Sequence, residues 1–249
     1  MSHNRTDVVY DMYSHLYWEP QKIDCIRRGD KKFTNEEWMI DNLKKLEVPL
    51  NHIMNIFFTC LNTQSTQRFF ERSLDKPNMS DDYDLYVRNL SQVVDIDKVF
   101  NPTQPDLFFV WDSHVISLEM KVSSKSDCQQ ILKYAFLHSA EQKKSLIKKK
   151  HHLLLLGKWE FSNFWKDTYN SPEEVKANCL KDIDNLSDKY KRYSKDIIQM
   201  LNNLMIHYIS YEDLALYLWQ QQKIIKDKKE YKLFEWLVQE LLERKLVRH

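Results

Sequence analysis

The sequence has 249 residues, of which 43% are hydrophobic and 29% charged, and its formal net charge is +1. These values are ordinary for a globular protein, and the small net charge means that any nucleic-acid contact must depend on local patches of charge. Only two glycines occur, so the sequence contains no glycine-rich loop of the P-loop or dinucleotide-binding type, and we expect no nucleotide cofactor.

The cysteine and hydropathy patterns favour an intracellular protein. The four cysteines are widely spaced without a CxxC pair, which favours reduced thiols over disulfides. The first residues, MSHNRTDVVYDMY, lack the apolar segment of a signal peptide. The longest charge-free run, Val48 to Gln67, contains Pro, Asn, Gln and Thr and is no membrane span. We therefore expect a cytoplasmic protein with no membrane contact.

Helical patterns dominate the first part of the chain. A short helix is predicted to begin at Thr34, which starts a capping-box pattern. A longer helix follows, because apolar residues recur at helical spacing between Ile53 and Leu74. The composition of residues 75–84 then predicts a loop.

Strand patterns replace helical ones between residues 93 and 122. The run VVDIDKVF, residues 93–100, is a candidate first strand. Two further apolar runs, DLFFVW and HVISLEMKV, are separated by Asp112 and Ser113, which predict a hairpin turn.

The second run of this hairpin has two different faces. Alternation along a strand places one set on an apolar face: Ile116, Leu118, Met120 and Val122. The opposite face carries Ser117, Glu119 and Lys121. We expect the apolar face to be buried and the other face to line a site.

A helix and a buried strand follow the hairpin. Ser126 is the candidate N-cap of the helix, and its apolar stripe consists of Ile131, Tyr134, Ala135 and His138. The continuous apolar run at residues 151–158 predicts a buried strand. A helix between two strands indicates a βαβ crossover.

From Ser171 onward the patterns are helical only. Ser171 and Pro172 form an N-cap followed by a proline at the first helical position. The last two helical patterns, ISYEDLALYLW and EYKLFEWLVQELLERKLV, fit an accessory bundle or dimerisation surface better than a winged-helix-like module that reads DNA.

Two acids and a lysine in the hairpin suggest a chemical site. Asp106 begins one strand, and Glu119 and Lys121 share a face of its partner. Two converging carboxylates suit Mg²⁺, and a nearby ammonium can orient or help deprotonate a water and offset charge on a phosphate. The alternative is a strand-initiating Asp106 beside an exposed Glu–Lys pair. Acid–any–lysine triplets recur in this chain, so the strand context gives the pattern its weight.

This arrangement, Pro105-Asp106 followed by Glu119-Met120-Lys121, resembles the PD-(D/E)XK nuclease superfamily. The resemblance covers roughly residues 51–158. It implies an α/β fold with a restriction-endonuclease-like core, in which a mixed central sheet is flanked by helices. The domain organisation expected here is an N-terminal helical extension at 1–50, a nuclease core at 51–170 and an all-α C-terminal region at 171–249.

The segment Gln130-Ile-Leu-Lys-Tyr134 also fits the QxxxY motif of the RecB-like branch of that superfamily. The resemblance implies DNA cleavage that depends on Mg²⁺, with Mn²⁺ as a substitute. The implied catalytic residues are Asp106, Glu119, Lys121, Gln130 and Tyr134. Ordinary helix packing is the alternative role of the glutamine and the tyrosine.

Further candidate site residues lie outside these motifs. In this superfamily a helix before the first strand often supplies another acid, so the implied metal ligands are Asp106, Glu119 and Glu71. A solvated helix acid is the favoured alternative for Glu71. The lysine-rich segment around KKSLIKKK either complements a helix C-terminus or contacts DNA. The candidate nucleic-acid-binding residues are Lys125, Lys133, Lys144 and Lys148.

The predicted function is a metal-dependent DNA endonuclease of a mobile element, phage or defence system. DNA is the expected partner, and the protein would act as a homodimer or in a larger nucleoprotein complex. The alternative is a catalytically inactive nuclease-fold protein that binds DNA or serves in assembly.

Overall fold

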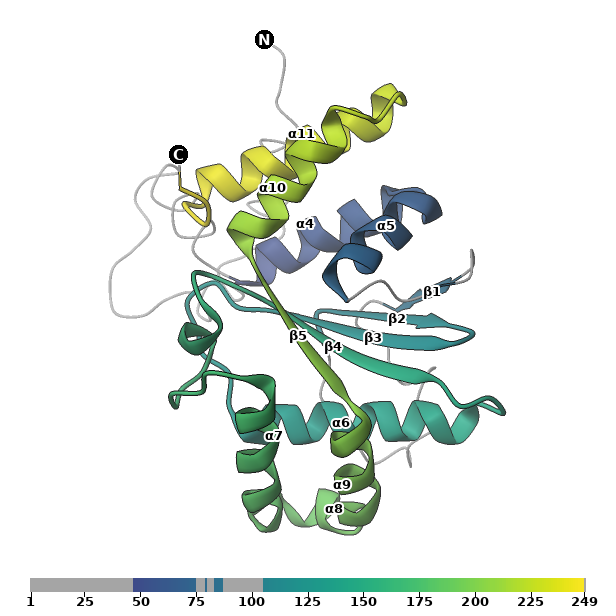
Figure 1. Cartoon of the computed structure of the whole chain (residues 1–249), viewed down its shortest axis with the longest axis vertical. Coiled ribbons are helices and arrows are strands. Elements are labelled where there is room, and N and C mark those ends of the chain that lie inside the picture. Colours follow the sequence, from purple (N-terminus) through teal and green to yellow (C-terminus); the bar gives the residue numbers. More distant parts are fainter. Residues whose placement is uncertain (1–46, 75–78, 80–82, 87–104, 249) are drawn as a thin grey trace, which may run out of the picture.

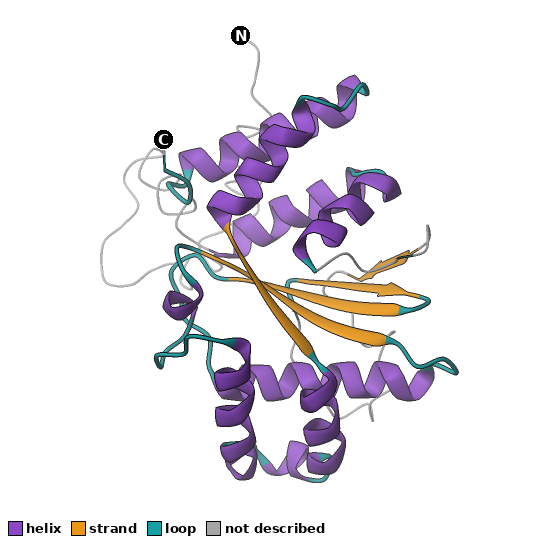
Figure 2. Ribbon diagram, in the orientation of Figure 1, coloured by secondary structure: helices purple, strands orange, loops and turns teal. Residues whose placement is uncertain are grey.

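The structure is a computed structural model that describes residues 47–74, 79, 83–86 and 105–248, and a five-stranded sheet lies at its centre (Figure 1). The strands lie in sequence order: β1 (Tyr83–Tyr86), β2 (Leu107–Trp111), β3 (His114–Met120), β4 (Lys150–Gly157) and β5 (Met205–Ser210). β1, β2 and β3 pair antiparallel, whereas β4 pairs parallel with β3 and with β5. Helices cover both faces (Figure 2), so the fold is α/β with a mixed sheet, as predicted.

Two predicted elements lie outside the described residues: the helix that begins at Thr34 and the strand at residues 93–100. The predicted loop at residues 75–84 is too long, because Tyr83 and Asp84 belong to β1 and pair with β2. Their alternating sequence, YDLY, fits an edge strand once a partner is present.

The hairpin turn at Asp112 and Ser113 is confirmed, and its pairing fixes the position of the acids. Leu107 at the start of β2 lies opposite Leu118 near the end of β3. Continuing this register places Asp106 beside Glu119 at one end of the sheet.

The two faces of β3 also divide as predicted. The hydrophobic cluster on one face includes Ile116, Leu118 and Met120, whereas the side chain of Glu119 reaches α6 (Cys128–Lys144) on the other. This second face is covered as well. All seven residues of β3 are buried, because α6 packs across this face and closes it.

One layer of helices covers the face that carries this cluster (Figure 1). It consists of α4 (Glu47–Cys60), α5 (Thr63–Ser73), α10 (Tyr211–Gln222) and α11 (Lys228–Glu243). Aromatic rings fill the space between α5 and the sheet. Phe70 lies with its ring centroid 4.8 Å from that of Phe109 and 5.5 Å from that of Trp111. Edge-to-face pairs of this kind add to the gain from burial.

The long helix predicted between Ile53 and Leu74 is two helices. Leu61 and Asn62 interrupt it, and the Asn62 side chain accepts a hydrogen bond from the Ser65 amide at 2.8 Å. The apolar spacing continues through the break, so periodicity alone does not reveal it, whereas an asparagine N-cap does.

The second layer covers the opposite face (Figure 1). It contains α6, α7 (Pro172–Lys181), α8 (Asp188–Lys191) and α9 (Ser194–Asn203), with 3₁₀ turns at Phe161–Phe164 and Ile183–Asn185. α6 connects β3 to the parallel strand β4, so the predicted crossover is confirmed. Its N-cap is Asp127 rather than Ser126, because the Asp127 carboxylate accepts from the Gln130 amide at 3.0 Å. The N-cap at Ser171 is confirmed.

The expectation of an all-α C-terminal region is wrong. Met205–Ser210 forms β5 and pairs with β4, since a short apolar run takes its structure from the neighbour it pairs with. Beyond it, α10 and α11 share one hydrophobic cluster with α4 and the sheet. They therefore form part of the core layer and not a separate winged-helix-like module. No helix among the described residues has the length and apolar character needed to cross a membrane.

The aromatic packing under α5 gives a stability prediction. Phe70→Ala removes a fully buried ring and should lower the free energy of unfolding by about 3–5 kcal/mol. Ile224→Ala is the control, because Ile224 is 60% exposed and its loss should change the free energy by less than about 0.5 kcal/mol. Urea unfolding followed by circular dichroism measures both. Equal effects of the two substitutions would contradict the burial of Phe70 between α5 and the sheet.

Candidate active site

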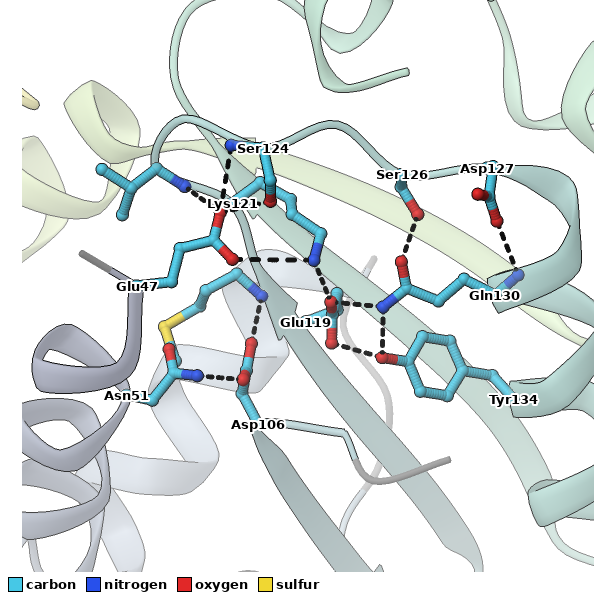
Figure 3. A network of polar contacts seen from close by, with 12 residues as sticks. Glu47, Asn51, Asp106, Glu119, Lys121, Ser124, Ser126, Asp127, Gln130 and Tyr134 are labelled. Atoms are coloured by element: carbon cyan, nitrogen blue, oxygen red, sulfur yellow. Dashed lines mark hydrogen bonds and ion pairs between the residues drawn. The ribbon is translucent and has the colours of Figure 1, made fainter. Parts of the chain in front are cut away.

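The residues singled out in the hairpin and in α6 meet at one end of the sheet (Figure 3). Asp106 precedes β2, Glu119 is near the end of β3, and Lys121 follows that strand. α6 begins beneath this end of the sheet and brings Gln130 and Tyr134 to the same place. The antiparallel pairing of β2 with β3 and the return of the chain into α6 together bring these side chains into contact.

Glu119 is the centre of the hydrogen-bond network. The residue is only 3% exposed. Its Oε1 atom lies 2.7 Å from the Lys121 ammonium and accepts a hydrogen bond from Gln130 Nε2 at 2.6 Å. Its Oε2 atom accepts a hydrogen bond from the Tyr134 hydroxyl. A buried carboxylate needs such compensation, and these three partners supply it.

The glutamine and tyrosine of α6 act as a pair. They are four positions apart on one helical face, and Gln130 Nε2 also donates to the Tyr134 hydroxyl at 2.9 Å. Ser126, predicted as the N-cap, instead donates to Gln130 Oε1 at 2.9 Å. This contact fixes the amide so that its NH₂ group faces the carboxylate. Burial, followed by the charge of Glu119, holds the pKa of Tyr134 well above its ordinary value, so the tyrosine stays a hydrogen-bond donor.

Asp106 is held from two sides. Its Oδ2 atom accepts from the Met120 amide at 2.6 Å, and its Oδ1 atom accepts from the Asn51 side chain of α4. Burial raises the pKa of Asp106 well above its ordinary value, and the nearby charge of Glu119 raises it further. The site therefore brings two acids together in surroundings that disfavour two negative charges.

The Lys121 ammonium lies between Glu119 and Glu47, and its side chain is 14% exposed. Burial alone would lower the pKa of Lys121, but the charges of Glu119, Glu47 and Asp106 outweigh burial and raise it. The side chain is therefore an ammonium ion over the neutral pH range.

Glu47, the first residue of α4, also belongs to this network. Its Oε2 atom lies 3.8 Å from the Lys121 ammonium. Its Oε1 atom accepts hydrogen bonds from the backbone amides of Val122 at 3.1 Å and Ser124 at 3.2 Å, and from the Ser124 hydroxyl. Glu47 thus fixes the loop after β3. Sequence reasoning assigned it to an extension outside the core and missed it, because no motif marks it.

A buried tyrosine is a second residue that sequence reasoning missed. Tyr211, the first residue of α10, is fully buried, and its hydroxyl makes no hydrogen bond with any described residue. Burial raises the pKa of Tyr211 well above its ordinary value, and the charges of Asp106 and Glu47 raise it further. The hydroxyl is a donor without a partner near two acids.

The other predicted site residues are spread over the molecule. Glu71 is exposed on α5 and is not part of the network of Asp106 and Glu119. Lys125 is exposed in the loop between β3 and α6, and Lys133 is half-buried in the first turns of α6. Lys144 ends α6, roughly 20 Å along the helix from Gln130 at 1.5 Å per residue.

Lys148 lies beyond this far end of α6, just before β4. The lysines predicted to bind nucleic acid therefore divide into two groups. Lys125 and Lys133 are near the acids, whereas Lys144 and Lys148 are at the opposite end of the sheet.

The donor set at the acids suits a hard cation. Two carboxylates, Asp106 and Glu119, offer oxygen atoms, and Mg²⁺ is typically bound by one or two carboxylates together with water and phosphate oxygens. Within the described residues, no three His, Cys, Asp or Glu side chains form a ready-made metal cluster. The residues therefore fit an ion held by two carboxylates that takes its remaining ligands from a substrate.

A tryptophan and two cations lie at the same end of the sheet. Trp159, just after β4, is 42% exposed and has a φ of 71°, a backbone conformation that is unusual for a large side chain. The Arg248 guanidinium lies 4.2 Å and the Lys158 ammonium 5.0 Å from the centre of its ring. An exposed aromatic ring with cations beside it is suited to contacts with bases and phosphates.

In comparisons with known proteins, no protein-family model, no curated protein and no solved structure matches the chain.

Proposed function

We propose that this protein is a metal-dependent nuclease that hydrolyses DNA phosphodiester bonds on a restriction-endonuclease-like core. The observation that carries the proposal is the meeting of Asp106, Glu119 and Lys121 at the end of the β2–β3 hairpin. The Gln130–Tyr134 pair gives further support, because both side chains bond to the Glu119 carboxylate. Neither packing nor an exposed ion pair requires all five residues in one buried network.

Each residue has a distinct role in the proposed reaction. Asp106 and Glu119 would hold one Mg²⁺ ion, and such an ion polarises the phosphate and lowers the pKa of the attacking water. Gln130 and Tyr134 hold the Glu119 carboxylate in place. Asn51 and the Met120 amide do the same for Asp106.

Lys121 acts as a cation rather than as a base. Its pKa is raised by the surrounding carboxylates, so it is an ammonium ion at neutral pH when no metal is bound. An ammonium at this position stabilises the negative charge that builds on the phosphate in the transition state. Glu47 positions Lys121 from the side opposite to Glu119.

The rim of the site offers contacts for the nucleic-acid backbone. Lys125 is exposed in the loop above Gln130, and Lys158 and Arg248 flank the exposed ring of Trp159. Lysine and arginine contacts to phosphates position a strand without selecting its sequence. This rim therefore favours a substrate held by its backbone and by stacking.

The first prediction concerns cleavage. Glu119→Gln and Lys121→Met should each lower Mg²⁺-dependent cleavage of linear, circular and single-stranded DNA by at least about a hundredfold, because each removes charge from the reacting centre. Glu71→Gln is the matched control, since Glu71 is exposed on α5, and it should cleave like the unchanged protein. Gel analysis of products in Mg²⁺, Mn²⁺ and EDTA measures the effect.

Two outcomes of this assay would contradict the proposal. Full activity of Glu119→Gln and Lys121→Met would mean that cleavage comes from another site. DNA binding without cleavage by the unchanged protein, in either metal, would favour a catalytically inactive nuclease-fold protein instead.

The second prediction concerns metal binding. Calorimetric titration should show one Mn²⁺ site, and Asp106→Asn should weaken it at least about tenfold because it removes an anionic ligand. Affinity should also rise with pH, because the raised pKa of Asp106 means that a proton must leave before the metal binds. Binding of Mn²⁺ that is equally tight in Asp106→Asn would exclude Asp106 as a ligand.

The third prediction concerns stability. Because the pKa of Asp106 is raised, its stabilising contribution is complete below its ordinary pKa and is lost as the pH rises through the raised value. Asp106→Asn removes this loss of stability and should raise the melting temperature at pH 8 without metal. Each 1 kcal/mol gained in the free energy of unfolding corresponds to a rise of about 2–4 °C.

This gain should shrink as the pH falls, because the unchanged protein then carries a protonated Asp106. Thermal unfolding at pH 8 and at pH 5 measures the difference. A variant that is less stable than the unchanged protein at pH 8 would show that the two acids do not repel each other in the fold.

A further inference from the structure

The end of the sheet opposite to the proposed catalytic site contains a cavity of about 570 Å³. It lies between the last turns of α6, the segment that leads into β4, and α9. Four lysines line it: Lys143, Lys148, Lys149 and Lys150. Its size is within the usual range of ligand-binding pockets, and the proposed cleavage reaction makes no use of it.

The charge in this cavity is not balanced by acids. Among its lining residues the only carboxylate is Asp196, which lies 2.5 Å from the Lys143 ammonium. Lys149 lies 3.5 Å from Glu141. Lys148 and Lys150 form no ion pair with any residue that the structure describes. Two of the four ammonium groups thus have no carboxylate partner, and this excess of positive charge favours the binding of an anion.

Side-chain hydrogen bonds from α6 hold the backbone of this lysine segment. Gln142 of α6 donates through its side-chain nitrogen to the Ile147 carbonyl at 3.0 Å. Its side-chain oxygen accepts from the Lys149 amide at 2.8 Å and also contacts His151 Nε2 at 3.0 Å. One glutamine thus fixes the backbone on both sides of Lys148. Fixing the backbone that carries the lysines lowers part of the entropy cost of binding.

The tip of the same segment is apolar and exposed. Leu146 is 105% and Ile147 61% exposed, and lysines precede and follow them in KKSLIKKK. Apolar side chains at the tip of a basic segment suit nucleic acid, because they can contact sugars and base steps while the lysines contact phosphates. A free inorganic anion would use the lysines alone.

We propose that this lysine-lined cavity and the tip beside it form a second nucleic-acid site, which binds adjacent backbone phosphates. The site extends the proposed function, since it takes the same class of polymer, but it does not depend on cleavage. α6 separates the two sites by roughly 20 Å, about six nucleotides of a strand at 3.4 Å each. The first few nucleotides of a strand anchored at the cavity therefore do not reach the reacting centre.

The test is binding of a fluorescent 20-nucleotide DNA strand to the full chain, in EDTA, over a range of salt concentrations. The double variant Lys148→Ala/Lys150→Ala should bind roughly tenfold more weakly at low salt, and its salt slope should fall by about 1–2. Leu146→Ser should weaken binding without changing the slope. Lys148→Arg/Lys150→Arg should restore both affinity and slope.

The matched control is Lys228→Ala/Lys229→Ala, which removes the same charge from two exposed residues at the start of α11. It should leave affinity within about twofold, since long-range charge effects are screened by salt. Equal losses in the control and the cavity variant would overturn the proposal, as would unchanged binding in the cavity variant. Melting temperatures of all variants verify that they fold.

Pyrophosphate supplies the second arm. If the cavity variant loses calorimetric binding of pyrophosphate but binds the DNA strand normally, the cavity takes small phosphates and the nucleic-acid assignment is overturned. Because the assay contains no metal, it is independent of cleavage. A protein that binds DNA through the cavity but never cleaves it would refute only the proposed nuclease activity.

Discussion

The buried carboxylate of Glu119 is the interaction on which the site depends. A charge in the interior is tolerated only when donors surround it, and here the donors come from two separate parts of the fold. Lys121 comes from the end of its own strand, and Gln130 and Tyr134 from the helix that covers the sheet. The carboxylate therefore links α6 to β3 and fixes the orientation of the Lys121, Gln130 and Tyr134 side chains. Packing alone gives no reason for a charge at this position.

The second acid, Asp106, lowers the stability of the fold when no added cation offsets its charge. Asp106 is brought beside Glu119 by the strand register, where burial and the charge of Glu119 raise its pKa and so disfavour its charged form. Lys121 supplies one positive charge for the carboxylates of Asp106, Glu119 and Glu47. Functional sites typically contain a few residues that lower the stability of the fold in this way. The same imbalance is the reason for proposing a divalent ion at this place.

The sequence predicted the parts of the site that depend on local order. Asp106, Glu119, Gln130 and Tyr134 lie on consecutive elements, and strand alternation with helical spacing is enough to bring them together. Glu47 could not be found in this way, because it contacts Ser124 across 77 positions of the chain. β5 was missed because a run of six residues becomes a strand only through its neighbour β4. Lys144 and Lys148 are close to the site in sequence, but a straight helix carries them away from it.

α6 contributes different side chains at the two ends of the sheet. At the start of α6, Gln130 and Tyr134 face a carboxylate and complete a network of acids. At its end, Gln142 and Lys143 face a cavity in which positive charge dominates. The acids and the lysines would neutralise each other if they were adjacent, since unscreened opposite charges at contact distance pair strongly. Separation along a rigid element of about 20 Å, twice the Debye length at 0.1 M salt, lets both persist in one small fold.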